Sequence, residues 1–377
     1  MKKIQAPLRM ALFVLIPVVF FYGIIQAKNF LYPLAFGLLL AYLLFPVVNF
    51  LEHHHLPRIA AILITILVSI IILASGIFLY YKQLTVMFED FDTMKEKANE
   101  NIEMFQDYLE RKIGLENNAI EEFLKKQTQQ IFGGDNGQLR KAFTATTGTL
   151  FKIGIMPVYV FLFLYYRTKF AYFILKLTRR KHKHVAINIL REISTVASRY
   201  MGGVVIVVLI LCVLNSVGLL IVGVKYAPIL GVLSALFNFI PYFGTLMGGI
   251  IPLLFVLLTS NDPLNLSLGV VVLFVIIQFI ENNILTPNIV GGNVQINPFF
   301  IIVGLVMGAM VWGIPGMLVT VPFLAITRII LVNIEKTRPV AFLLGPKGTL
   351  KHSITKDKIQ RFFSIKKSDG PGMPSSS

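Results

Sequence analysis

Residues 226–261 read YAPILGVLSALFNFIPYFGTLMGGIIPLLFVLLTSN, a run of 36 positions without Asp, Glu, Lys or Arg. A soluble domain carries about 25% charged residues, so a run of this length belongs in an apolar environment. Residues 59–81 and 202–224 are uncharged over 23 positions each. A helix of about 20 apolar residues is long enough to cross the hydrocarbon core of a bilayer. The sequence therefore predicts an all-α, polytopic membrane protein.

The composition of the whole chain agrees with this prediction, because 55% of its 377 residues are hydrophobic and only 14% are charged. The net charge of +16 is also typical of nucleic-acid-binding proteins. Here, however, the basic residues gather in the tails and in one loop, an arrangement that orients membrane proteins. We therefore expect a lipid bilayer as partner and no nucleic acid. The single cysteine, Cys212, excludes an intrachain disulfide and a metal site built on cysteines.

We expect about eight membrane crossings, some of them broken or re-entrant. They are predicted at 10–26, 30–50, 59–81, 148–166, 202–224, 227–259, 264–284 and 298–332. These crossings divide the chain into three N-terminal transmembrane helices (1–81), an extracytoplasmic amphipathic helical region (82–147), a fourth span with a basic cytoplasmic segment (148–200), a C-terminal transport region (201–332) and a basic cytoplasmic tail (333–377). Because no small-residue cleavage site follows 10–26, this segment is interpreted as a retained helix.

The charge changes sign along the chain. Residues 82–141 contain 9 basic and 12 acidic residues, whereas 167–199 contain 9 basic residues and one acidic residue, and 333–377 contain 9 and 3. Basic segments of membrane proteins stay in the cytoplasm, so a bacterial inner-membrane protein with both termini cytoplasmic is predicted, with 82–141 outside. Within that acidic region, Phe88, Phe91 and Met94 recur at helical spacing, which predicts an amphipathic helix.

Only three charged residues occur between Arg199 and Arg328, namely Lys225, Asp262 and Glu281. The first two lie at predicted span ends, whereas Glu281 follows an apolar run. A carboxylate at membrane depth costs several kcal/mol unless it faces water, protein or an ion. Glu281 is therefore interpreted as a pathway or coupling-ion residue, with an interfacial position at the mouth of a loop as the alternative.

Two uncharged segments are rich in helix breakers, 238–244 and 287–298. Proline removes a backbone donor and glycine loosens a helix. Broken helices occur within membranes where they line a cavity or pack on protein, and in transporters they build the substrate site. Kinked helices packed through small residues are the alternative. The candidate pathway residues are Asn238, Pro241, Tyr242, Gly244, Glu281, Asn282, Asn283, Pro287, Gly291 and Pro298.

The stretches 229–258 and 300–327 are also alike, since each has an Ile-Pro pair followed by glycines and a second proline. The pairs are Ile240-Pro241 and Ile314-Pro315. If each stretch is one crossing from outside to inside, the two form a parallel repeat.

Other chemistry is disfavoured. Three adjacent histidines, His53, His54 and His55, cannot all face one ion from a regular backbone, so an interfacial loop is expected rather than a metal site. The chain has no GxxxxGK[ST] phosphate-binding loop, no G-x-S-x-G and no H-E-x-x-H. We therefore expect no ATPase activity, no cofactor, no bound metal and no enzymatic function.

The sequence resembles the autoinducer-2 exporter family of bacterial membrane proteins over essentially its whole length. The resemblance is carried by NFIPYFG at 238–244, ENNILTPNIVG at 281–291, Asn297-Pro298 and the closing pattern of Gly304, Gly308, Gly313, Gly316 and Pro322. It implies a secondary transporter that assembles as a homo-oligomer. Members often carry Tyr-hydrophobic-Arg-Gly-Gln before the fifth span, and this chain has YMGGV at 200–204 instead, which puts its specificity in question.

Three functions remain open from the sequence. The first is export of a small polar solute or signalling molecule through the C-terminal half. The second is sodium (cation)–proton antiport, for which Glu281 is the ionisable group, since some similar proteins are assigned as antiporters. The third is a non-transporting membrane scaffold.

Overall fold

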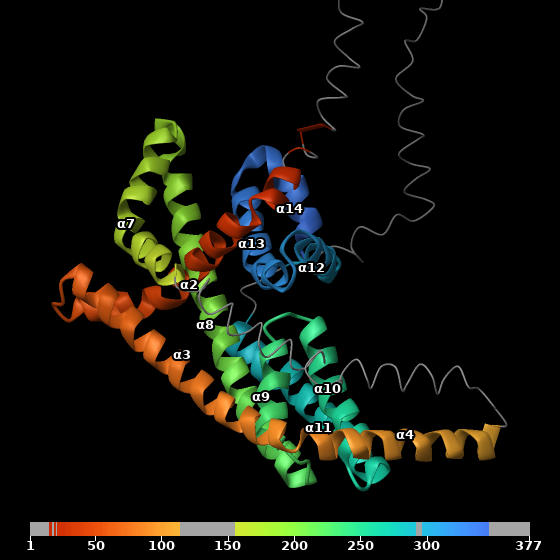
Figure 1. Cartoon of the computed structure of the whole chain (residues 1–377). Helices are drawn as coiled ribbons and strands as arrows, with labels where there is room; N and C mark the ends of the chain where they lie inside the picture. The colour runs from red at the N-terminus through yellow and green to blue at the C-terminus, as the bar shows by residue number, and fades with distance from the viewer. Residues whose placement is uncertain (1–14, 17–18, 20, 114–154, 292–295, 347–377) are drawn as a thin grey trace, which may run out of the picture.

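The computed structural model describes residues 15–16, 19, 21–113, 155–291 and 296–346. Within these ranges the chain forms helices and no strands (Figure 1). They are α2 (Lys28–His53), α3 (Arg58–Glu89), α4 (Phe91–Ile113), α7 (Met156–Leu177), η2 (Arg180–His182), α8 (Lys183–Val222), α9 (Ala227–Phe237), α10 (Phe243–Thr259), α11 (Pro263–Ile280), the π-helix η3 (Glu281–Val290), α12 (Pro298–Trp312), α13 (Ile314–Asn333), η5 (Glu335–Thr337) and α14 (Arg338–Leu344).

Six helical segments of the described chain are long and apolar enough to cross a membrane. They are Lys28–His53, Arg58–Glu89, Met156–Leu177, Arg180–Val222, Pro263–Val290 and Ile314–Asn333. Three shorter apolar helices, α9, α10 and α12, accompany them. The prediction of an all-α polytopic membrane protein is thus confirmed. About half of the crossing predicted at 10–26, and the start of the one predicted at 148–166, lie outside the described residues.

The 40-residue helix α8 runs through most of the molecule (Figure 1). At about 1.5 Å per residue it is about 60 Å long, roughly twice the thickness of the hydrocarbon core. It passes without a break through the boundary predicted at 200/201, so the last part of the basic segment, 183–199, and the fifth span form one continuous helix. The helix ends at Gly223, whose positive φ of 90° lets its N–H reach the carbonyls of Leu219 and Leu220.

The stretch 227–259, which the sequence analysis predicts as one crossing, is two antiparallel helices, α9 and α10. We call this pair the first hairpin. A Cβ on Gly244 would lie 1.9 Å from the Phe237 carbonyl oxygen, and one on Gly248 would lie 2.9 Å from the Ser234 carbonyl oxygen. The two helices therefore pack with their backbones in contact. Because α9 has only 11 residues, or about 16 Å, it is too short to cross a bilayer on its own.

The stretch 298–332 is likewise two antiparallel helices, α12 and α13, which we call the second hairpin. The chain reverses at Gly313 with a φ of 69°. A Cβ on Gly316 would lie 1.9 Å from the Gly308 carbonyl oxygen, and Thr320 Oγ1 donates to the Gly304 carbonyl at 3.2 Å. The likeness of the two stretches is therefore a likeness of hairpins, and the prediction that each is one crossing is wrong.

The two hairpins open toward opposite ends of α8. The first begins at Ala227, just after the C-terminal end of α8. The second ends at Asn333, whose side chain donates to Glu192 Oε2 near the N-terminal end of α8 at 3.2 Å. Thirty helical residues separate Glu192 from Val222, or about 45 Å.

Helix α4 lies across the open end of the first hairpin (Figure 1). Its buried face contains Met94 and Ala98, which pack with Phe255 and Leu258 of α10. Asn101 donates hydrogen bonds from Nδ2 to the carbonyls of Leu258 (3.0 Å) and Ser260 (2.9 Å), and so satisfies groups that the end of α10 leaves open. In the region where an amphipathic helix is predicted, α4 covers 91–113, whereas Phe88 of the predicted pattern lies in α3. The side of the membrane on which it lies stays a prediction, and residues 114–147 lie outside the described part.

Candidate functional site

Glu281 lies at the junction of α11 and η3, with only 8% of its surface exposed. Two side-chain amides donate to its Oε2, Asn238 Nδ2 at 3.2 Å and Gln278 Nε2 at 3.2 Å. Asn238 is 43 residues away in sequence and closes the C-terminal end of α9. The tip of the first hairpin and the end of α11 are thus joined through one buried carboxylate. We call Asn238, Gln278 and Glu281 the carboxylate–amide cluster.

The cluster contains one acidic group and no basic one. Among the residues that the structure describes, no Lys, Arg or His forms an ion pair with Glu281. In addition, Asn238 Oδ1 is enclosed and has no hydrogen-bond donor in the described chain. A buried acceptor without a donor is costly, and a buried carboxylate is normally paired or coordinates an ion. The cluster therefore has unmet capacity to accept a proton donor or a cation.

The turn of the first hairpin explains why Asn238 reaches this position. Tyr242 adopts a positive φ of 63°, and the N–H of Gly244 donates to the Ile240 carbonyl at 2.8 Å. Pro241 lies within this turn, where its missing N–H costs no helical hydrogen bond. Gly244 is required because any side chain there would strike the backbone of Phe237. The breakers of 238–244 thus build a tight reversal of the chain.

The second breaker segment begins inside η3, whose wide turns start at Glu281. Pro287 lies inside this π-helix, and π-type turns commonly mark functional sites in helices. The π-helix η3 is followed by Gly291, which has a φ of 65°. Its last residue, Val290, packs beside Tyr200 of α8 in one buried cluster, and a Cβ on Gly203 would lie 3.1 Å from Val290 Cα. The glycine at 203, within the variant YMGGV run, lets α8 approach the backbone of η3.

The other candidate pathway residues do not join the carboxylate–amide cluster. Asn282 and Asn283 are exposed, and the Asn283 amide donates to the Phe279 carbonyl at 2.8 Å instead. Pro287 and Tyr242 are exposed as well, and Pro298 begins α12. Sequence analysis missed Gln278, although its position three residues before Glu281 puts both side chains on one helix face.

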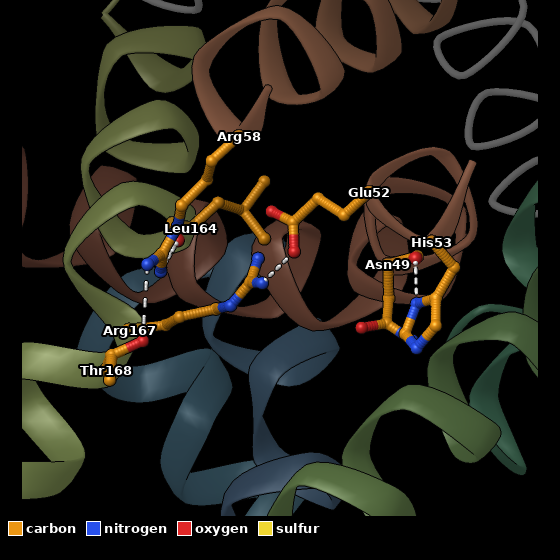
Figure 2. A network of polar contacts seen from close by, with 7 residues as sticks. All are labelled: Asn49, Glu52, His53, Arg58, Leu164, Arg167 and Thr168. Atoms are coloured by element: carbon orange, nitrogen blue, oxygen red, sulfur yellow. Dashed lines mark hydrogen bonds and ion pairs between the residues drawn. The ribbon is translucent and has the colours of Figure 1, made fainter. Parts of the chain in front are cut away.

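A second polar network, absent from the sequence predictions, joins α2, α3 and α7 (Figure 2). Arg167 of α7 forms an ion pair with Glu52 at the end of α2. Arg58, at the start of α3, donates to the Leu164 carbonyl at 2.8 Å and to Thr168 Oγ1 at 3.2 Å. Because these bonds link residues more than 100 positions apart, the network ties the α2–α3 turn to α7.

Two of the three adjacent histidines, His53 and His54, bond back to their own helix beside this network. His53 Nδ1 lies 2.7 Å from the Asn49 carbonyl oxygen (Figure 2), and His54 Nδ1 lies 2.9 Å from the Phe50 carbonyl oxygen. Each ring thus bonds back to its own helix. The described residues contain no group of three or more His, Cys, Asp or Glu side chains placed to hold a metal ion.

The family described as "AI-2E family transporter" matches residues 14–336. "Putative transport protein YrrI" of Bacillus subtilis is 28% identical and the match covers 82% of this chain and 88% of that protein. A "Putative transport protein" of Borreliella burgdorferi is 26% identical, with 86% and 88% covered. "Putative transport protein YueF" of Bacillus subtilis is 26% identical, with 83% and 86% covered.

Proposed function

The chain belongs to the AI-2E family of transporters, and from that premise we propose that it is a secondary transporter that moves a small polar solute or signalling molecule across the bacterial cytoplasmic membrane. The observation that carries the proposal is the bond between Asn238, at the tip of the first hairpin, and buried Glu281. A polar cluster inside an apolar bundle costs free energy. The presence of this cluster is explained if a polar solute passes there.

The arrangement of the hairpins supports alternating access. The two hairpins open toward opposite ends of α8. Each hairpin can therefore line a solute pathway from a different end of the molecule. A solute held at the tip of the first hairpin would gain hydrogen bonds from the amides and the carboxylate of the cluster. Movement of the tip past Glu281 would then exchange access between the two ends. Broken helices of this kind build substrate sites in other transporters.

Cation–proton antiport is the second candidate, and a separate observation favours it. Asn238 Oδ1 is enclosed without a donor, beside a carboxylate that has no basic partner among the described residues. Carboxylate and amide oxygens are ligands for hard cations. A carboxylate that binds a proton and a cation in turn would couple the two flows, and Glu281 is the group in the cluster able to do so.

The test is flux into proteoliposomes that contain the full chain, with Glu281→Gln, Asn238→Leu and the exposed control Asn283→Ala. If the protein transports a polar solute, uptake of a small polar metabolite should fall strongly in Asn238→Leu and only partly in Glu281→Gln. Antiport predicts a cation-driven proton flux that Glu281→Gln abolishes. In either case Asn283→Ala should behave as wild type. Unchanged flux in both cluster variants would overturn the assignment of the pathway, and no flux of any kind would favour a scaffold.

We further propose a homo-oligomer in the inner membrane, with both termini cytoplasmic and α4 outside. The sign of the charge supports the orientation, because 167–199 are strongly basic and 82–141 are acidic. Cys212 is the single cysteine, so Cys212→Ser with one new cysteine at Lys95 or Lys181 gives clean probes. A membrane-impermeant maleimide should label the Lys95 position in intact cells and the Lys181 position only after lysis. The reverse pattern would invert the topology.

A further inference from the structure

A pocket of about 560 Å³ lies between the N-terminal end of α8, the C-terminal end of α13 and α14. It is separate from the carboxylate–amide cluster, because none of its lining residues belongs to the first hairpin, α11 or η3. The lining combines two guanidinium groups and two side-chain amides with apolar walls. The residues are Val185, Asn188, Arg328, Val332, Asn333, Arg338, Ala341, Phe342, Gly345 and Pro346.

Arg328 gives the strongest evidence that an anion binds in this pocket. It lies on α13, and its Nε is enclosed without a hydrogen-bond acceptor in the described chain. No ion pair joins it to an acidic side chain among the residues described. A cationic group with an enclosed, unbonded N–H is costly. A resident anion would remove that cost.

Neighbouring groups strengthen the positive charge of the pocket. Arg338 also lines the pocket. It donates one long hydrogen bond, from Nε to the Val332 carbonyl at 3.4 Å. The acidic side chain of Glu192 contacts the pocket residue Asn333: Glu192 Oε2 accepts a hydrogen bond from Asn333 Nδ2 at 3.2 Å. The η2 turn that precedes α8 adds Arg180 and Lys181 at the same end of that helix. The pocket is therefore cationic, with one acid engaged in its wall.

We propose that this pocket binds a phosphate group through Arg328 and Arg338. Guanidinium groups match phosphate oxygens in paired hydrogen bonds. Basic pockets between membrane helices on the cytoplasmic side hold lipid head groups, and this end of α8 is the one for which we propose a cytoplasmic position. The phosphate belongs either to an anionic lipid or to a soluble compound, and the apolar walls suit the glycerol or acyl portion of a lipid.

The experiment measures ligand binding to the delipidated full chain in detergent. Native mass spectrometry counts bound phosphatidylglycerol and phosphatidylcholine during titration, and equilibrium dialysis measures radiolabelled inorganic phosphate. The variants are Arg328→Gln, Arg338→Gln and Val185→Trp, of which the last fills the pocket and keeps every charge. Arg199→Gln is the matched control, because Arg199 is an exposed arginine of α8 outside the pocket lining.

If the ligand is a lipid, the protein should bind phosphatidylglycerol in preference to phosphatidylcholine. Arg328→Gln should weaken this preference about tenfold or more, which is the loss expected when a charge-assisted hydrogen bond is removed. A soluble ligand predicts saturable phosphate binding with no preference between the lipids. In both cases Val185→Trp should bind weakly and Arg199→Gln normally. If all three pocket variants bind like Arg199→Gln, or if wild type shows neither preference nor phosphate binding, the proposal is wrong. Since Val185→Trp removes no charge, its result stands even where Arg328→Gln fails to fold.

Discussion

Replacing Gly244 by alanine should force the first hairpin apart. The new Cβ would lie 1.9 Å from the Phe237 carbonyl oxygen and 2.4 Å from its carbon. Both are backbone atoms, so no rotamer change relieves the clash and the two helices must separate. Overpacking of this kind costs about 1–3 kcal/mol and occasionally more. That exceeds the gain of about 1 kcal/mol that alanine has over glycine inside a helix, so the net effect is destabilising.

Gly249→Ala is the matched control on the same helix. Its nearest neighbour is the side chain of Phe274 at 3.8 Å, which is ordinary van der Waals contact, so this variant should be as stable as wild type or more stable. Cys212 is a built-in probe, because it is the single cysteine of the chain and packs against the buried cluster that contains Leu211 and Ala235. A dye that fluoresces on reaction with this thiol reports when the bundle opens on heating.

The expected result is a clear separation of the two variants. One kcal/mol shifts the midpoint by about 2–4 °C for 150–250 residues and by less for a chain of 377 residues. Gly244→Ala should therefore lower the unfolding midpoint by about 1–3 °C, whereas Gly249→Ala should leave it unchanged or raise it. Transport should fall in the same order, because separation of the helices carries Asn238 away from Glu281. If Gly244→Ala unfolds and transports like Gly249→Ala, the backbone contact that defines the first hairpin is refuted.

Three further contacts can be tested in the same way. The pKa of exposed Asp90 is lowered by hydrogen bonds from Lys225 and Tyr226, so its stabilising effect should be complete above about pH 4 and should vanish as the pH falls through the lowered pKa; melting curves of wild type and Asp90→Asn should differ at pH 7 and converge in acid. Asn101→Leu leaves two carbonyls at the end of α10 without a donor, which should cost about 2 kcal/mol and speed amide hydrogen exchange in the last turn of that helix. Glu52→Gln strands the half-buried Arg167 guanidinium, so a double-mutant cycle with Arg167→Met in thermal unfolding should give a coupling of about 1 kcal/mol or more, and additive effects would contradict the ion pair.

The helical character of the apolar segments follows from composition, whereas the reversals within them, and hence the number of helices, do not. Residues 227–259 contain no acidic or basic side chain, so hydropathy gives the same value for one long crossing and for a hairpin. Pro241 and Gly244 are visible in the sequence as helix breakers. What decides the reversal is the packing of Gly244 against the backbone of Phe237, a tertiary contact that hydropathy does not report.

The isolation of Glu281 among apolar residues was enough to predict that it needs a partner. Which partner it has depends on the first hairpin, because Asn238 reaches the carboxylate only where the chain turns back. The three candidate asparagines, Asn238, Asn282 and Asn283, were therefore equivalent from the sequence. The ion pair of Glu52 with Arg167 escaped prediction for the same reason, since 115 residues separate the two groups.

The two hairpins share a backbone design and differ in what their turns contact. In each, a glycine lets one helix touch the backbone of the other, at Gly244 in the first and Gly316 in the second. The turn of the first carries Asn238 to a buried carboxylate. Beside the turn of the second, Trp312 donates its indole N–H to the Ile24 carbonyl at 3.2 Å, a bond that needs no charged or solvated partner. Since transport of a polar solute would require polar groups that the solute can engage, we propose that the pathway lies at the first hairpin, whereas the second contacts the N-terminal segment through Trp312.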